Sequence, residues 1–202
     1  MRRFSIILIF LAAAASARAQ QTILDKVTFG AEWGYIGVIH SGFHYNFFAP
    51  EGFRLDPRGN TFKYSSNAEG YLHAGYNFSD DWNLSLYVGL AGVEEYAHIL
   101  PMSLRGTRYF RENGMGDRWL AFLDLGSGIC LKTPPQEILV GKFGGGYRVS
   151  LSRDTKLDFL FALRMTYTHP EIDFYGTPIP MERINRNNAY VSAFSAGMAI
   201  TF

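Results

Sequence analysis

The residue types needed for hydrolysis lie close together in the segment 40–67. His40, Ser41 and His44 are near neighbours, and Glu51 follows them. A histidine base, a serine nucleophile and an acid are the parts of a hydrolytic triad. The spacing matches no triad pattern, so we predict no catalytic residue and keep a hydrolase as an alternative. Apart from His40 and His44, the five histidines lack the spacing of metal ligands, and we expect no metal and no cofactor.

Charged residues occupy alternate positions in two neighbouring segments. If "SRDT" closes a hairpin with an odd-numbered loop, Arg148 lies opposite Asp158, which is a favourable pair. The same register sets Lys142 against Arg164, a repulsive pair that requires an acid. Because buried charges persist when they are paired, we interpret these residues as a salt-bridge network that fills an interior. A gated or narrow polar path is the alternative. The predicted network comprises Glu32, Arg105, Asp124, Lys142, Arg148, Asp158 and Arg164.

Aromatic residues crowd the same long segment that holds the histidines. Exposed aromatic side chains on this scale usually mark contact with another molecule. Alternatively, they fold back over the mouth of the molecule or continue the strand that precedes them. A second segment, "IDFYGTPIPM", would then pack against the first as a lid. The candidate contact residues are Phe43, Tyr45, Phe47, Phe48 and Phe53.

The elements that position these residues are strands, because apolar residues alternate along most of the chain. The pattern predicts eight strands, a number typical of a closed barrel. Pro101 is the only proline within a predicted strand, and its position indicates that the fourth strand begins elsewhere or is bulged. The predicted strands are centred on residues 29–35, 72–78, 84–90, 100–104, 119–125, 139–149, 157–167 and 190–202.

The two faces of these strands indicate which side meets lipid. One face is apolar, and Arg108, near a short turn, is the charge closest to its membrane band. The other is rich in glycine and carries isolated charges of both signs, as expected for a narrow interior. Short turns alternate with longer connections, although two of the outer connections are also short. A sheet that enters lipid must close, because an open edge leaves backbone groups unsatisfied.

The first residues have the layout of a secretory signal peptide. Arg2 and Arg3 precede the apolar run "FSIILIFLAAAA", and "ARA" ends at Ala19. We therefore expect a cleaved signal peptide at 1–19 and a barrel domain at 20–202. Cleavage leaves 16 basic and 18 acidic side chains, which does not suggest a nucleic-acid surface. The single cysteine, Cys130, excludes an intramolecular disulfide.

Together, the eight alternating strands, the motifs "YLHAGYNFSDDWNLSLYVGLAG" and "LPMSLRGTRYF", and the final Phe202 resemble the small outer-membrane barrels of the OmpA/OmpX/OmpW type. The resemblance implies a Gram-negative bacterial outer membrane. It also implies that the barrel-assembly machinery reads Phe202 as an insertion signal. This fold hosts adhesins, anchors, small channels and lipid-modifying enzymes, so it does not specify a function. The lipid A deacylases of this fold use a His-x-Ser arrangement, which this sequence lacks.

The sequence thus predicts an all-β protein, a transmembrane up-and-down antiparallel barrel of eight strands. We expect a non-enzymatic structural or surface-interaction role, with a polar interior plugged by paired charges. A narrow, porin-like channel for small or hydrophobic solutes is the first alternative, and a lipid-modifying hydrolase of the outer leaflet is the second. The expected partners are outer-membrane lipid, the barrel-assembly machinery, and an extracellular ligand or protein bound by the long loops.

Overall fold

A computed structural model describes residues 26–94, 97–110, 116–131, 137–152 and 154–202. The predicted signal peptide, residues 1–19, lies outside the described residues. Among the described residues, no helix has the length and apolar character needed to cross a membrane.

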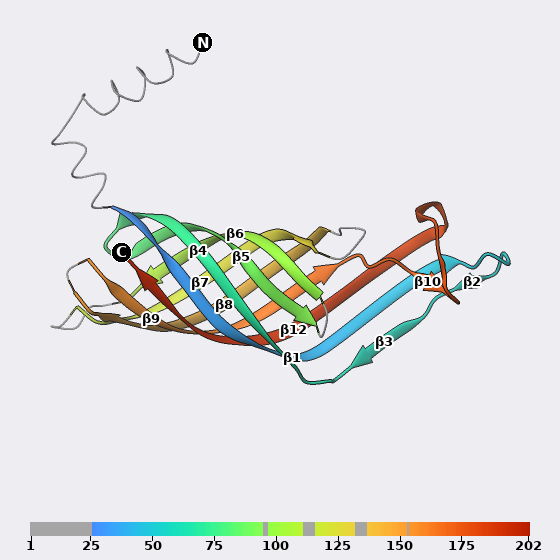
Figure 1. Cartoon of the computed structure of the whole chain (residues 1–202), viewed down its shortest axis with the longest axis horizontal. Helices are drawn as coiled ribbons and strands as arrows, with labels where there is room; N and C mark the ends of the chain where they lie inside the picture. The colour runs from blue at the N-terminus through green and yellow to red at the C-terminus, as the bar shows by residue number, and fades with distance from the viewer. Residues whose placement is uncertain (1–25, 95–96, 111–115, 132–136, 153) are drawn as a thin grey trace, which may run out of the picture.

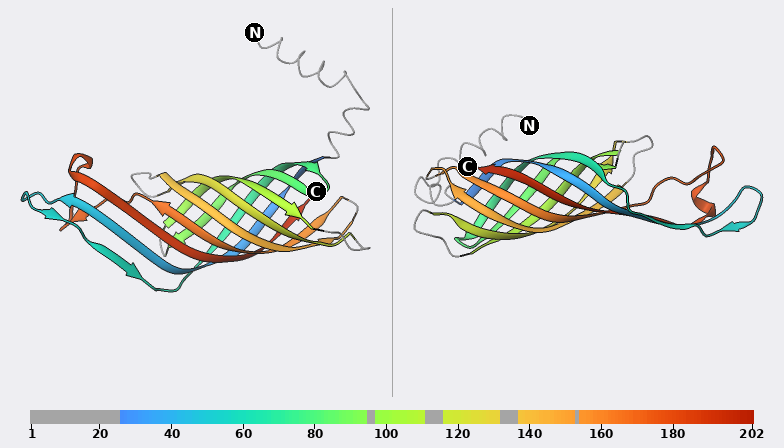
Figure 2. Two further views of the ribbon diagram at one scale, coloured as in Figure 1. Left: turned by 180° about the vertical axis from the view of Figure 1, so that it is seen from behind. Right: turned by 90° about the horizontal axis from the view of Figure 1, so that it is seen from below.

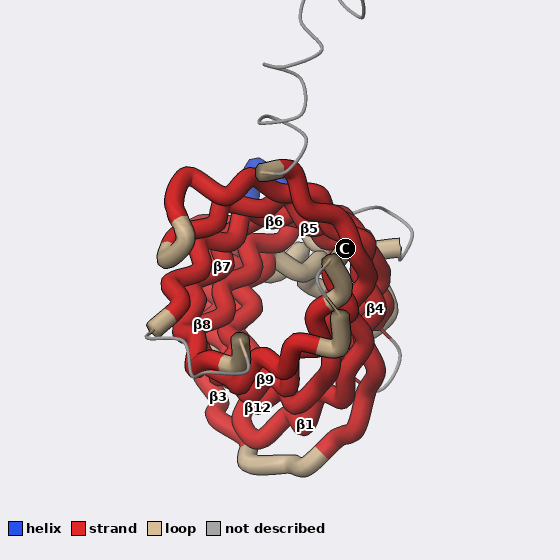
Figure 3. Tube along the Cα trace, turned by 90° about the vertical axis from the view of Figure 1, so that its left-hand side faces the viewer, coloured by secondary structure: helices blue, strands red, loops and turns tan. Residues whose placement is uncertain are grey.

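In this part of the chain, eight long strands form one closed antiparallel sheet (Figures 1 and 3). Each strand pairs with the next around the barrel, and the last returns to pair with the first. The predicted fold class is therefore confirmed. The barrel strands are β1 (Val27–Phe48), β4 (Ser65–Ser79), β5 (Trp82–Glu94), β6 (Ala97–Tyr109), β7 (Arg118–Cys130), β8 (Glu137–Ser150), β9 (Lys156–Thr168) and β12 (Ile184–Thr201).

Pro101 lies inside β6 and not at its start, because the strand begins four residues earlier, at Ala97. Its side chain is fully buried. The register between β5 and β6 is the same on both sides of Pro101, so there is no bulge at this position. Instead, the β5–β6 ladder is interrupted between Met102 and Ile99, where proline has no N–H to donate. The pairing with β7 continues through Pro101 and Gly128.

β1 and β12 continue together well beyond the end of the barrel, and this extension is here called the arm (Figures 1 and 2). In the arm, residues 40–47 of β1 pair with residues 184–192 of β12. On the other edge of β1 lie β2 (Arg54–Leu55) and β3 (Arg58–Thr61). The chain between β9 and β12 contains the hairpin β10 (Asp173–Phe174) and β11 (Thr177–Pro178), followed by the 3₁₀ turn η1 (Met181–Arg183).

In the arm, the aromatic residues of the segment 40–67 continue the strand before them, which is one of the alternatives that the sequence leaves open. β1 is 22 residues long, and the predicted loop supplies its last nine residues as well as β2, β3 and the start of β4. Both chain ends described here, Lys26 and Phe202, lie at the opposite end of the barrel, with the short turns (Figure 1).

Candidate functional site: the barrel interior and the arm

A chain of alternating charges crosses the barrel interior. Arg164 Nη1 donates to Glu69 Oε2 over 2.8 Å, and Lys142 Nζ lies 2.9 Å from the same oxygen. Lys142 Nζ also lies 3.4 Å from Oε1 of Glu32. The Arg105 guanidinium then joins Glu32 and Asp124, at 2.5 Å and 2.9 Å. These residues come from β9, β4, β8, β1, β6 and β7, so the chain of ion pairs connects opposite walls of the barrel.

A separate pair lies nearer the short turns. Arg148 donates to both carboxylate oxygens of Asp158, over 2.6 and 2.7 Å, in a bidentate arrangement. The register sets Arg148 opposite Asp158 and Lys142 opposite Arg164, as the hairpin parity predicts. Among the described residues, the buried charges number four cations and four anions, so the interior is neutral as a whole. The buried charged residues are Glu32, Glu69, Arg105, Asp124, Lys142, Arg148, Asp158 and Arg164.

Sequence reasoning missed Glu69, the acid that separates Lys142 from Arg164. It lies on the same face of β4 as Tyr71 and His73, and all three side chains are buried. Extending the alternation of β4 by one further step from Tyr71 would have found it. The tyrosines of this face also take part, since the Tyr71 hydroxyl donates to Glu69 over 3.1 Å and the Lys142 ammonium lies 4.3 Å from the Tyr71 ring centroid.

The interior is polar in its middle and apolar toward the arm. Near the short turns it is mixed, because Tyr109, Leu120, Phe122 and Ala162 form a smaller apolar cluster, and the Arg148 guanidinium lies over the Tyr109 ring. This corrects the expectation of a wholly polar lumen. The barrel is narrow enough for inward side chains of opposite strands to pack together, as they do in small barrels. The apolar cluster toward the arm consists of Ile36, Val38, Tyr71, Tyr87, Ala91, Val93, Ile99, Ile138, Val140, Val191 and Ala193.

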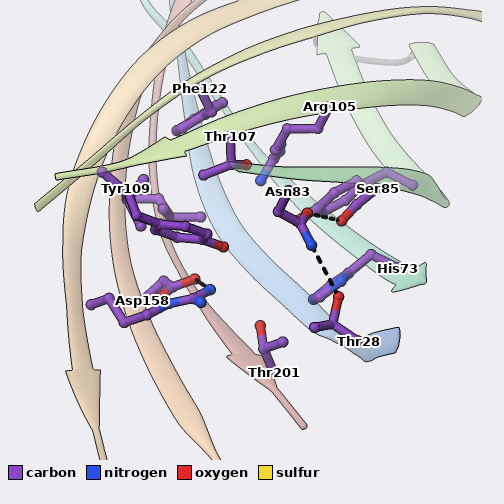
Figure 4. A pocket seen from close by; sticks show the side chains of 14 residues that line it. Thr28, His73, Asn83, Ser85, Arg105, Thr107, Tyr109, Phe122, Asp158 and Thr201 are labelled. Carbon is purple, nitrogen blue, oxygen red and sulfur yellow. Dashed lines mark hydrogen bonds and ion pairs between the residues drawn. The ribbon is translucent and has the colours of Figure 1, made fainter. Parts of the chain in front are cut away.

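On the short-turn side of the charge network is a cavity of about 20 Å³ (Figure 4). This volume holds about one water molecule. His73 borders the cavity and stacks on Tyr87 with ring centroids 4.8 Å apart. Asn83 donates to Thr28 over 3.3 Å on the same wall. Among the described residues, inward side chains therefore pack together across the lumen, and this cavity leaves room for about one water molecule.

The outer wall of the barrel has the opposite character, since large apolar side chains are exposed along every barrel strand. Soluble proteins rarely expose apolar surface on this scale. Trp82 and Trp119 stand beside the short turns, where aromatic girdles lie in membrane barrels. Among the exposed side chains are Phe29, Leu72, Leu84, Leu86, Val88, Leu90, Leu100, Met102, Leu104, Leu123, Leu125, Leu139, Phe143, Phe159, Phe161, Leu163 and Met165.

The protein folds as an outer-membrane β-barrel. In such barrels the short turns face the periplasm and the longer loops face outward, so the arm lies on the extracellular side.

One face of the arm has its own small apolar core. Phe47, Ile172 and Ile179 are buried against one another, although they come from β1 and from the chain between β9 and β12. The ring of Phe174 lies edge-on to Phe47, with centroids 5.9 Å apart. Phe48, in contrast, is 41% exposed. Of the predicted contact aromatics, Phe47 is thus a core residue, Phe43 and Tyr45 stack on each other at 4.8 Å, and Phe53 lies against Phe174 at 6.2 Å.

The other face of the arm is polar and basic. Asp56 accepts hydrogen bonds from Asn46 over 3.0 Å and from Arg58 over 2.9 Å, and it contacts His44 Nε2 at 2.8 Å. Together these contacts hold the pKa of the Asp56 carboxyl well below its usual range, with the Asn46 contribution the largest. Arg54 donates to Asn46, and Arg186 to His44 Nδ1. We call Arg54, Arg58 and Arg186, with His44, Asn46 and Asp56, the arginine face.

The arm does not assemble the hydrolytic trio considered from the sequence. Both ring nitrogens of His44 are engaged, by Asp56 and by Arg186. Ser41 points to the other face of β1, since odd and even residues of a strand alternate. The ring of His40 packs against Phe62, with centroids 4.6 Å apart. Among the described residues, no group of three or more His, Cys, Asp or Glu side chains is placed to hold a metal ion.

Phe202 lies at the seam where the barrel closes. Its backbone exchanges two hydrogen bonds with Phe29, of 2.8 and 3.2 Å, and the two rings are 5.7 Å apart. The side chain is half-exposed on the outer wall.

No family model and no curated protein matches the chain. The solved structures with a similar arrangement include the following three. Neisserial surface protein A is 11% identical, with 86% of this chain and 97% of that one covered and a TM-score of 0.46. Outer membrane protein OprG from Pseudomonas aeruginosa is 15% identical, with 88% of this chain and 96% of that one covered and a TM-score of 0.48. Outer membrane protein AlkL is 14% identical, with 88% of this chain and 90% of that one covered and a TM-score of 0.46. The fold assignment rests on the closed sheet and its apolar outer wall.

Proposed function

We propose that this protein is a non-enzymatic surface-interaction protein of the outer membrane, and that the arm is its binding element. The observation that carries the proposal is the continuation of β1 and β12 beyond the barrel into an arm with its own packed core. A barrel that served only as a structural element of the membrane would not need such an extension. A barrel that served as a conduit would need an open lumen.

The chemistry of the arm indicates the kind of partner. The arginine face carries three guanidinium groups and a single carboxylate. The Arg58 side chain is 66% exposed, so its donors are accessible to a partner. Guanidinium groups form strong, charge-assisted hydrogen bonds with phosphate, sulfate and carboxylate groups. We therefore assign the arginine face to an anionic partner outside the cell, such as a glycan that carries these groups.

The test measures binding of the purified, folded barrel to dextran sulfate, with neutral dextran as the comparison. Wild-type protein is expected to bind dextran sulfate alone, and less tightly as the salt concentration rises, because salt screens exposed charges. The triple variant Arg54→Gln, Arg58→Gln and Arg186→Gln should lose most of this binding. A control with Lys26→Gln and Lys156→Gln changes charge at the other end of the barrel and should bind like wild type.

Two results would contradict the proposal. If the triple variant binds as well as wild type, the arginine face is not the contact surface. If wild-type protein binds neither polymer, the arm does not select anionic partners.

A further inference from the structure

Arg108 is an unusual residue on the outer wall of the barrel. It points outward from β6 near the short turns, and its side chain is exposed. Its guanidinium carbon lies 5.3 Å from the Trp82 ring centroid and 5.9 Å from that of Phe110. Within the described residues, no acidic side chain forms an ion pair with it. The free-energy cost of a charged side chain is small near the interface and rises toward the membrane centre, so the guanidinium of Arg108 stays at the interface.

A hollow in the apolar wall begins at Arg108 and runs toward the membrane centre. Gly106 forms part of its floor, and a Cβ atom added there would meet no other atom within 4 Å. Ala121, directly opposite Arg108 on β7, continues this low floor. The hollow measures about 580 Å³. Its rim consists of larger side chains, which are Trp82, Leu104, Leu123, Leu125 and Phe143.

We propose that this hollow binds one glycerophospholipid with an anionic headgroup from the periplasmic leaflet. The phosphate would accept hydrogen bonds from Arg108, and one acyl chain would lie over Gly106 and Ala121 between the larger side chains. Two independent features match the two parts of such a lipid, since a cation without a described acidic partner stands at the mouth of an apolar groove. The ring contacts with Trp82 and Phe110 hold the guanidinium beside the groove and leave its N–H donors for a phosphate.

The position of the hollow selects the leaflet. Arg108 lies beside the short turns, which face the periplasm in barrels of this class. The lipids of that leaflet are glycerophospholipids, whereas lipid A occupies the outer leaflet beside the arm. This site is separate from the arginine face, so the proposal stands whether or not the arm binds an anionic partner.

The experiment measures lipid retention by native mass spectrometry of the detergent-solubilised barrel, with phosphatidylglycerol and phosphatidylcholine as probes. Wild-type protein should retain phosphatidylglycerol roughly fivefold to tenfold more strongly, as expected for one charge-assisted contact. Arg108→Gln should reduce retention of phosphatidylglycerol to the level of phosphatidylcholine. Gly106→Leu fills the groove and should weaken retention of both lipids.

Controls separate the site from general effects on the barrel. Gly70 also faces outward with nothing within 4 Å of an added Cβ, but it lies on β4, outside the hollow. Gly70→Leu should therefore retain lipid like wild type. A heat-modifiable band on a gel verifies that each variant is folded.

Three outcomes would overturn the proposal. If Arg108→Gln retains phosphatidylglycerol at the wild-type level, Arg108 does not bind the headgroup. If Gly106→Leu retains both lipids at the wild-type level, the groove does not bind the acyl chain. Stronger retention of lipid A than of phosphatidylglycerol, lost in Arg108→Gln, would assign the hollow to a lipid of the other leaflet.

Discussion

Lys142 and Arg164 face each other across β8 and β9, and both contact the same carboxylate oxygen of Glu69. Two cations in direct opposition repel each other, so the register of this hairpin depends on an acid from elsewhere. That acid comes from β4, on a different part of the barrel wall. Arg164 has no other ion pair among the described residues, whereas Lys142 also reaches Glu32. Glu69 therefore offsets the charge of Arg164 and part of that of Lys142.

We predict that Glu69→Gln strongly destabilises the barrel. Removal of one partner leaves a buried cation uncompensated, and the free energy of unfolding should fall by about 3–5 kcal/mol. Urea unfolding of the barrel in detergent micelles measures the change. Glu51→Gln, at an exposed position in the arm, should alter stability by less than about 0.5 kcal/mol. Adding Arg164→Met to Glu69→Gln should recover much of the loss, and a double variant no more stable than the single one would contradict this account.

The parity of the hairpin predicts which interior charges face each other, because side chains in a strand alternate with a period of two. The parity does not identify Glu69 as an inward-facing acid if β4 is taken to begin after that residue. For the arm, the sequence leaves two alternatives open. His44 and Asn46 alternate with Phe43, Tyr45 and Phe47 as in a strand, but a strand need not extend beyond the membrane, so the sequence does not decide between a continued strand and an aromatic loop. The contact of Phe47 with Ile172 joins distant parts of the chain, and periodicity alone carries no information on such pairs.

The filled interior predicts that the protein does not conduct ions. The charge network and the apolar cluster block the lumen, and the cavity between them and the short turns has room for about one water molecule. Planar-bilayer recording of refolded protein should show no stable conductance, while a heat-modifiable band demonstrates that the barrel is folded. Stable conductance steps would contradict this prediction and would make Glu32, Asp124, Lys142 and Arg164 candidates for pore-lining residues.

Phe47 and Phe48 should respond differently to truncation, although they are neighbours. Phe47 is 3% exposed within the arm core, and its replacement by alanine should cost about 3–5 kcal/mol of arm stability. Phe48 is 41% exposed, so Phe48→Ala should cost much less. The rate of tryptic cleavage at Arg183 in η1 reports opening of the arm, and the barrel itself should remain heat-modifiable in both variants. Equal cleavage rates in the two variants would show that the cluster around Phe47 does not hold the arm together.

The hypothesis that Phe202 is an assembly signal makes a prediction that separates recognition from packing. Phe202→Ala should reduce insertion of the barrel in cells severalfold, while refolding of the purified variant into detergent stays close to wild type. Phe29→Ala removes the other ring of the same contact and serves as the matched control. If the two variants are impaired equally in both assays, the loss reflects packing at the seam and not recognition by the assembly machinery.

The contacts of Asp56 predict how the arm responds to acid. Hydrogen bonds from Asn46, Arg58 and His44 lower the pKa of this carboxyl in the folded arm, relative to about 3.9 for a free aspartate. Because the pKa is lower in the folded arm, the ionised carboxyl stabilises the folded form at pH values above the pKa of the unfolded state. This contribution is lost as the pH falls through the pKa of the folded state. The arm should therefore keep the full contribution from pH 7 down to about 4 and lose it only in stronger acid.

The carboxyl-carbon chemical shift of Asp56 measures its titration directly, and its midpoint should lie below about 3.9. Asn46→Ala combined with Arg58→Gln removes two of the three contacts and should move the midpoint upward. A midpoint at or above 3.9 in the wild-type protein, or one unmoved in the double variant, would show that these hydrogen bonds do not favour the ionised carboxyl.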